Sequence, residues 1–113
     1  MHELSLVMSI IDIALDQASK AGAQKVEEIE LEIGVLSTVE LNAFEFAWLQ
    51  GKKNTSLEHC SLKIDRIPGM ALCLECDTEF PVTEVYEACP VCGKHVSQIV
   101  KGKELRVKSL VVI

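Results

Sequence analysis

Apolar positions spaced three and four residues apart predict the first helix of the chain. The pattern runs from Leu4 to Lys20, and Gly22 follows just past its end. The width of the apolar arc favours a helix packed deep on a sheet, with self-association or partner docking as the alternative. The apolar positions are Leu4, Leu6, Val7, Ile10, Ile11, Ile13, Ala14, Leu15 and Ala18.

Strict alternation then predicts strands. Apolar and acidic residues alternate from Val26 to Ile33, as in a strand with one face in water. A capping box at Ser37 and Glu40 predicts that Ser37 caps a second helix, which spans about 39–50 and stops at Gly51. Residues 57–67 and 104–113 alternate again and predict a second and a third strand, expected to pair with each other.

These elements predict an α+β fold. Two helices pack on a three-stranded sheet, and a four-cysteine zinc knuckle module is inserted between the second and third strands. The expected division is an α/β domain of residues 1–67 with 101–113, and a zinc-binding domain of residues 68–100.

The inserted module carries two C-x₂-C pairs separated by twelve residues. Two such pairs supply four thiolates to one tetrahedral Zn²⁺, and Gly93 permits the tight turn that a knuckle needs. Four protein ligands leave no open coordination position, so the predicted zinc is structural. The predicted ligands are Cys73, Cys76, Cys89 and Cys92.

Three other interpretations of the cysteines are weaker. A redox C-x₂-C belongs near a βαβ unit, and a zinc deaminase needs an H-x-E sequence, which is absent here. A nucleic-acid-binding ribbon is opposed by charge, since residues 68–98 hold five acidic residues against Lys94 alone. Cys60 is interpreted as a buried thiol on a strand. His59 and His95 are interpreted as surface residues, with a zinc-tuning role as the alternative for either.

Composition narrows the class of protein. The 113 residues suit one compact domain or a domain with a small insertion, and 49% are apolar, as in globular proteins. A net charge of −6 disfavours nucleic acid as a partner. No apolar run is long enough to span a membrane and no signal sequence is recognisable, which predicts a cytoplasmic protein. Reduced thiols in that compartment favour metal binding over disulfides.

Three segments together resemble the HypA/HybF family of nickel metallochaperones over essentially the whole chain. They are Met1-His2-Glu3-Leu4-Ser5, Ile33-Gly34-Val35-Leu36-Ser37, and C-x₂-C…C-P-x-C-G with Gly102-Lys103-Glu104-Leu105. The resemblance implies an N-terminal nickel site of Met1, His2 and Glu3. It also implies a partner GTPase and delivery of nickel to the [NiFe]-hydrogenase large subunit, with urease as a second client in some relatives.

The chemistry of the N-terminus agrees with that implication. The Met1 amine, the His2 amide nitrogen and the His2 imidazole can close five- and six-membered chelate rings on one ion, and the Glu3 amide can fill a fourth corner. Such a tetragonal nitrogen set suits Ni²⁺ or Cu²⁺ better than Zn²⁺. We therefore expect a non-enzymatic nickel carrier with a structural zinc; the alternative is a zinc-stabilised adaptor for protein partners without nickel transfer.

Overall fold

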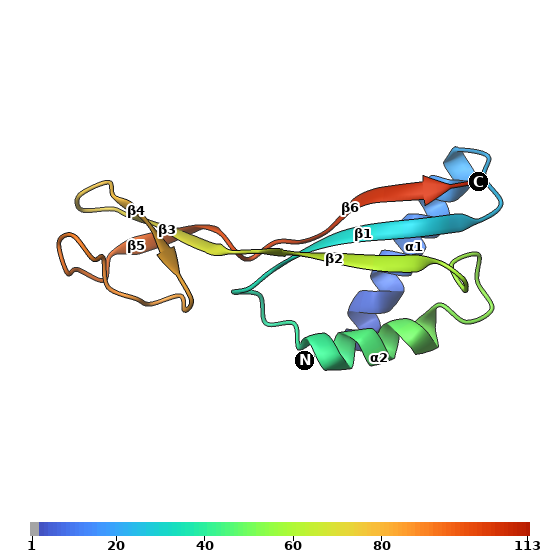
Figure 1. The fold of residues 1–113 in the computed structure, drawn as a ribbon, viewed down its shortest axis with the longest axis horizontal. Coiled ribbons are helices and arrows are strands. Elements are labelled where there is room, and N and C mark those ends of the chain that lie inside the picture. The colour runs from blue at the N-terminus through green and yellow to red at the C-terminus, as the bar shows by residue number, and fades with distance from the viewer. Residues whose placement is uncertain (1–2) are drawn as a thin grey trace. The chain divides into compact units, whose positions relative to one another are not determined.

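The computed structural model describes residues 3–113. In chain order its elements are α1 (Glu3–Lys20), β1 (Val26–Gly34), α2 (Leu41–Gly51), β2 (Ser61–Ile67), β3 (Gly69–Cys73), β4 (Glu79–Val82), β5 (Ser97–Lys101) and β6 (Leu105–Val112) (Figure 1). Two helices and two three-stranded sheets result, which confirms the predicted α+β class and adds a second sheet. No helix among residues 3–113 is long and apolar enough to cross a membrane.

Contacts divide the chain into two compact units. The helical unit comprises Met1–Leu31, Thr38–Ile64 and Arg106–Ile113, and the cysteine unit comprises Glu32–Ser37 and Asp65–Leu105. Each unit is assembled from segments far apart in sequence, because β1, β2 and β6 all pass from one unit into the other.

The first sheet has the order β2-β1-β6, so β1 is its central strand. The predicted pairing of the second and third strands with each other is therefore wrong, because both flank the first. Lys25 and Ile113 exchange two backbone hydrogen bonds of 3.1 and 3.0 Å, the signature of an antiparallel pair at the β1–β6 end. The predicted alternation in β1 is confirmed, since Ile29, Leu31 and Ile33 are buried.

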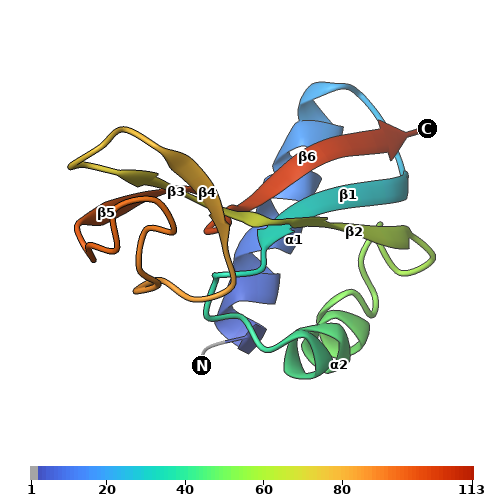
Figure 2. The same cartoon turned by 60° about the vertical axis from the view of Figure 1, so that its left-hand side comes forward.

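Helix α1 buries one face against the rest of the helical unit (Figure 2). Val7, Ile11 and Ala14 on that face are at most 1% exposed. The predicted apolar arc is only partly used, because Leu4 and Ile13 are 57% and 50% exposed.

Helix α2 begins differently from the prediction. Glu40, not Ser37, is its N-cap, and its carboxylate accepts hydrogen bonds from the Asn42 and Ala43 N–H groups at 3.2 and 2.6 Å. The Ser37 N–H donates to the Gly34 carbonyl, so Ser37 turns with the end of β1 instead. A glutamate side chain three residues closer to the helix supplies the acceptor that its first N–H groups need.

Gly51 also serves a different purpose. It is the last residue of α2, and a Cβ there would lie 2.9 Å from Val7 Cγ1 and 3.1 Å from Ile11 Cδ1 of α1. The missing side chain therefore lets the two helices approach each other closely, whereas the prediction treated Gly51 only as a stop signal.

The second strand starts later than predicted. Residues 57–60 form a turn in which Cys60 N–H donates to the Leu57 carbonyl at 3.0 Å, and β2 begins at Ser61. Side chains impose that turn, since Thr55 Oγ1 accepts from the Leu57 N–H and Glu58 accepts from the Asn54 N–H. Cys60 is buried, as predicted, but it lies at the end of the turn and not on the strand.

The cysteine unit contains a second sheet, of order β4-β3-β5, that was not predicted. Both neighbours of β3 are antiparallel to it, with Gly69 opposite Val82 and Cys73 opposite Ser97. Its small core consists of Ala71, Cys73, Phe80, Val82 and Cys89, with Leu36 and Ile99 packed against it. Two of the cysteines are thus part of the core itself.

Three glycines allow the strands of this unit to cross closely. A Cβ on Gly34 would lie 1.9 Å from the Gly102 carbonyl oxygen, and one on Gly69 would lie 2.3 Å from the Val82 carbonyl oxygen. Gly102 has a φ of +114°, and Leu36 packs over both Gly69 and Gly102. We call Gly34, Leu36, Gly69 and Gly102 the glycine crossing; side chains larger than hydrogen do not fit at its three glycines.

Candidate metal centre

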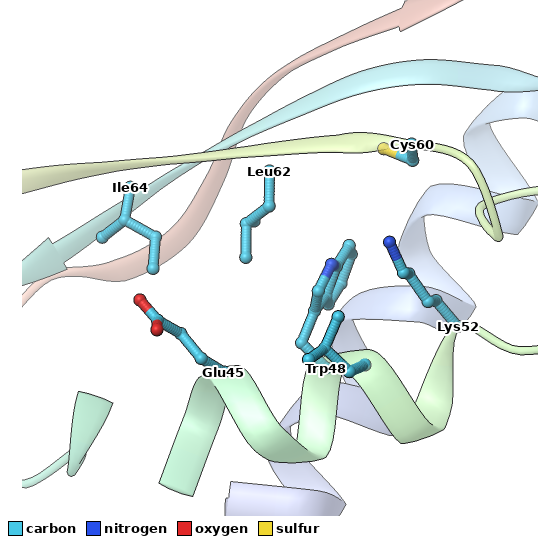
Figure 3. A pocket seen from close by; sticks show the side chains of 7 residues that line it. Glu45, Trp48, Lys52, Cys60, Leu62 and Ile64 are labelled. Carbon is cyan, nitrogen blue, oxygen red and sulfur yellow. The ribbon is translucent and has the colours of Figure 1, made fainter. Parts of the chain in front are cut away.

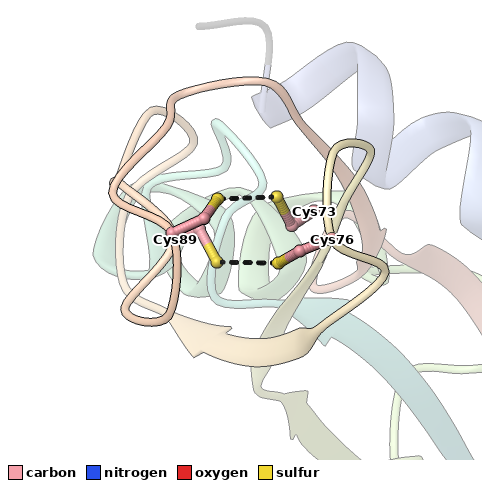
Figure 4. A group of neighbouring side chains, drawn as sticks. Cys73, Cys76 and Cys89 are labelled. Atoms are coloured by element: carbon pink, nitrogen blue, oxygen red, sulfur yellow. Dashed lines mark hydrogen bonds between the residues drawn. The ribbon is translucent and has the colours of Figure 1, made fainter.

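The four paired cysteines converge on one point of the cysteine unit (Figure 4). Cys73 ends β3, Cys76 follows in the turn toward β4, and Cys89 and Cys92 come from the loop before β5. All four Sγ atoms lie within 4.8 Å of one another. Cys73 and Cys89 are buried, whereas Cys76 and Cys92 face solvent.

The sulfur spacing fits a tetrahedral zinc ion. The Cys73 and Cys92 Sγ atoms are 3.6 Å apart, and the Cys76 and Cys89 Sγ atoms are 3.7 Å apart. Zn–S bonds of about 2.3 Å in a regular tetrahedron require sulfurs about 3.8 Å apart. Disulfides would need about 2.05 Å, and all five cysteines of the chain are free thiols.

The two knuckles share one backbone design. In the first, Cys73 N–H donates to the Thr78 carbonyl and Asp77 N–H donates to the Cys73 carbonyl, each at 2.9 Å. In the second, the Cys89 N–H donates to the Lys94 carbonyl at 2.9 Å, and the Gly93 N–H donates to the Cys89 carbonyl at 2.8 Å. The same offsets of five and four residues recur, so each knuckle presents its sulfurs in the same way.

Both knuckles close through a left-handed residue at the same position. Gly93 has a φ of +75°, which confirms the predicted turn, and Asp77 has a φ of +59° at the equivalent place in the first knuckle. Aspartate is one of the few residues with a side chain that tolerates this conformation. The role of Asp77 was not predicted, because no glycine marks its position.

Polar side chains support the cluster from outside. The Lys94 ammonium lies 3.0 Å from a Glu75 carboxylate oxygen and so links the two knuckles. The Thr78 hydroxyl lies 3.2 Å from Cys76 Sγ, and this hydrogen bond, together with one to the Thr78 backbone and those to Cys89 and Cys73, lowers the pKa of the Cys76 thiol to about 6. A thiolate at neutral pH is the form that binds a metal ion.

The remaining candidate residues lie outside this cluster. His95 is exposed and does not belong to the ligand group, and the His59 side chain is 90% exposed beside Glu58. Burial raises the pKa of the Cys60 thiol, so this cysteine is a poor metal ligand.

The N-terminal candidates are only partly visible. Met1 and His2 lie outside the described residues, and Glu3 opens α1. Glu3 is only 7% exposed, and its carboxylate accepts a hydrogen bond from the Glu40 N–H at 3.3 Å. The start of α1 is thereby tied to the capped start of α2.

Comparison with known proteins decides the family. Residues 1–112 match the family model described as hydrogenase/urease nickel incorporation, metallochaperone, hypA. The chain belongs to the HypA family. A hydrogenase maturation factor HypA of Parabacteroides distasonis is 46% identical over 112 residues, covering 99% of this chain and 97% of that protein. A hydrogenase maturation factor HybF of Klebsiella pneumoniae is 41% identical over 110 residues, covering 97% of each chain.

Solved structures agree with this HypA-family assignment. The solution structure of the Ni metallochaperone HypA from Helicobacter pylori aligns with a TM-score of 0.73 at 27% identity, over 100% of this chain and 98% of that one. The family resemblance expected from the sequence is confirmed, and it extends to both units. The HypA family acts in hydrogenase maturation and handles nickel, and the four-cysteine group suits zinc.

Proposed function

We propose that this chain is a nickel metallochaperone that binds Ni²⁺ through Met1, His2 and Glu3 and delivers it for maturation of [NiFe]-hydrogenase. The observation that carries the proposal is the match of residues 1–112 to a nickel-incorporation family, which includes the N-terminal His2. The chain acts as a carrier and not as an enzyme.

The environment of Glu3 supports a main-chain ligand. Its carboxylate is already used by the Glu40 N–H, so releasing it would cost that hydrogen bond and expose a buried group. Its amide belongs to the first turn of α1, where N–H groups have no acceptor within the helix. The Met1 amine, the His2 amide and imidazole and the Glu3 amide then form one tetragonal nitrogen set.

The second part of the proposal is a structural zinc held by Cys73, Cys76, Cys89 and Cys92. The spacing of the sulfur atoms and the two matched knuckles support it. With all four positions supplied by the chain, the ion would contribute to folding of the cysteine unit, whose apolar core is small. We accordingly assign nickel binding to residues 1–67 with 101–113 and zinc binding to residues 68–100.

The proposal includes a cytoplasmic location and two protein partners, the hydrogenase-maturation GTPase and the [NiFe]-hydrogenase large subunit. Exposed apolar residues on α1, such as Leu4 and Ile13, offer a surface for a partner or for a homodimer. The net charge of −6 gives no attraction for nucleic acid.

The test is a Ni²⁺ titration of zinc-loaded protein with a native N-terminus, followed by calorimetry and d–d absorption. We expect near-stoichiometric binding with a planar-type band, lost in His2→Ala and kept in His59→Ala, which removes a histidine that is exposed. Binding that is absent or indifferent to His2→Ala would favour the zinc-stabilised adaptor.

A further inference from the structure

A groove opens in the helical unit between α2 and β2 (Figure 3). Its volume is about 340 Å³. We call it the Trp48 groove; its lining residues are Glu45, Trp48, Leu49, Lys52, Cys60, Leu62 and Ile64. In Figure 3 the side chains of β2 point toward α2, and those of α2 point back toward the strand.

The floor of the groove is apolar and holds one unused donor. Leu62 and Ile64 are only half-buried although they face α2, and Leu49 is 53% exposed at the rim. Trp48 is 3% exposed, yet its indole N–H has no acceptor among residues 3–113. The fully buried polar side-chain atoms without a partner in this part of the chain are the hydroxyls of Ser37 and Ser97, so the indole N–H is not shut off from the groove. A buried tryptophan N–H normally finds a partner, so this donor remains available to an occupant.

The two ends of the groove carry opposite charges. Glu45 lies at the Ile64 end and Lys52 at the Cys60 end (Figure 3). Neither side chain forms a salt bridge within the described part of the chain. Lys52, the C-cap of α2, lies seven positions after Glu45, about 10.5 Å along the helix axis. This distance is close to the span of four to five strand residues.

Strand β2 offers an open edge beside the groove. It is the outer strand of the sheet β2-β1-β6. The Ile67 carbonyl accepts from Val35 N–H, so odd-numbered residues of β2 turn their backbone toward β1. Because strand residues alternate, Leu62 and Ile64 present their N–H and C=O groups outward, where an added strand would pair with them.

From these features we infer that the Trp48 groove binds an extended segment of a partner protein with the pattern basic–x–apolar–x–acidic. The segment runs antiparallel to β2, the more stable pairing, so its basic residue meets Glu45 and its acidic residue meets Lys52. The apolar side chain lies on Trp48 between them. The binding needs neither nickel nor zinc, and it holds whether or not the proposed nickel function is correct.

The sequence provides a direct reporter, because Trp48 is the only tryptophan of the chain. We would titrate the full-length, zinc-supplemented protein with the peptide acetyl-GKTLTDG-amide and follow tryptophan emission. The comparison peptide, acetyl-GDTLTKG-amide, has the same composition with its charges exchanged. We expect a saturable emission change with the first peptide and binding about threefold to tenfold weaker with the second.

Charge exchange in the protein makes the test decisive. The double variant Glu45→Lys with Lys52→Glu keeps the net charge and should prefer the second peptide. Lys53→Glu is the matched control, since Lys53 neighbours Lys52 but does not line the groove; it should retain the original preference. No emission change at millimolar peptide, or an unchanged preference in the double variant, would overturn the inference. A dimer that the double variant dissociates, measured by light scattering, would assign the groove to a second copy and overturn it equally.

Discussion

The left-handed closing residue of each knuckle gives a prediction whose size follows from the backbone. Gly93→Ala places a Cβ where nothing lies within 4 Å, so any effect comes from conformation and not from a clash. At a φ of +75°, an alanine costs about 1–2 kcal/mol relative to glycine. Alanine also loses less entropy on folding, about 0.4–1 kcal/mol, which leaves a net cost of about 1 kcal/mol.

The cost should appear in the zinc affinity. Because a small zinc module folds as it binds its metal, strain in the folded knuckle weakens binding, here by about fivefold. Competition for Zn²⁺ with a chromophoric chelator measures this change. Gly22→Ala is the matched control, since Gly22 has a φ of +67° and equally open surroundings but lies in the helical unit. Asp77→Gly should bind within about twofold of wild type, because aspartate tolerates the left-handed conformation and the small strain that glycine relieves is offset by its larger loss of entropy on folding. Unchanged affinity in Gly93→Ala, or an equal loss in Gly22→Ala, would refute the reasoning.

Three further predictions follow from other contacts. Gly51→Ala, normally favourable in a helix, should destabilise the protein by about 1–3 kcal/mol in urea unfolding, because its Cβ meets Val7; a more stable variant would contradict the close approach of the helices. Cys60 should resist iodoacetamide at pH 7.5 in the zinc-loaded native protein and react only after denaturation, since burial raises its pKa; mass spectrometry reads this directly. Hydrogen bonds from the backbone of residues 84 and 83 and from the Thr83 hydroxyl lower the pKa of Glu87. Ionised Glu87 therefore stabilises its loop above a pH of about 4.3, and the stabilisation is lost as the pH falls further. We expect faster amide exchange at Thr83 in Glu87→Gln than in the wild type at pH 7.

The elements that the sequence predicts best are those that bury one face at a regular spacing of apolar residues. Periodicity places α1 and β1 within a residue or two, because burial of Val7 and Ile11, or of Ile29 and Leu31, requires that spacing. The cysteine spacing likewise predicts the cluster at residues 73–92, because two such knuckles have few other ways to satisfy four thiolates.

The features that were not predicted depend on single side chains or on how distant strands pair. The capping signal at Ser37 is real as a pattern, but Glu40 lies closer to the helix and takes the role. The sheet around β3 escapes prediction because its strands have four or five residues, and Pro81 in β4 argues against a strand unless it lies at an edge. The order of the first sheet, with β1 between β2 and β6, was also not predicted, because alternation within a strand does not show which strands pair.

The glycine crossing has a consequence for anyone who wishes to move the zinc-binding region into another protein. Residues 68–100 read as a portable cassette, yet Leu36 covers Gly69 and Gly102 from a segment more than thirty residues upstream. A synthetic peptide of residues 68–100 lacks Gly34, Leu36 and Gly102, so the apolar core that Leu36 packs against would be exposed on that side. A graft that keeps the four cysteines must therefore carry two separate stretches of chain, Glu32–Ser37 and Asp65–Leu105, and the natural protein can exchange this region with a relative only by replacing both at once.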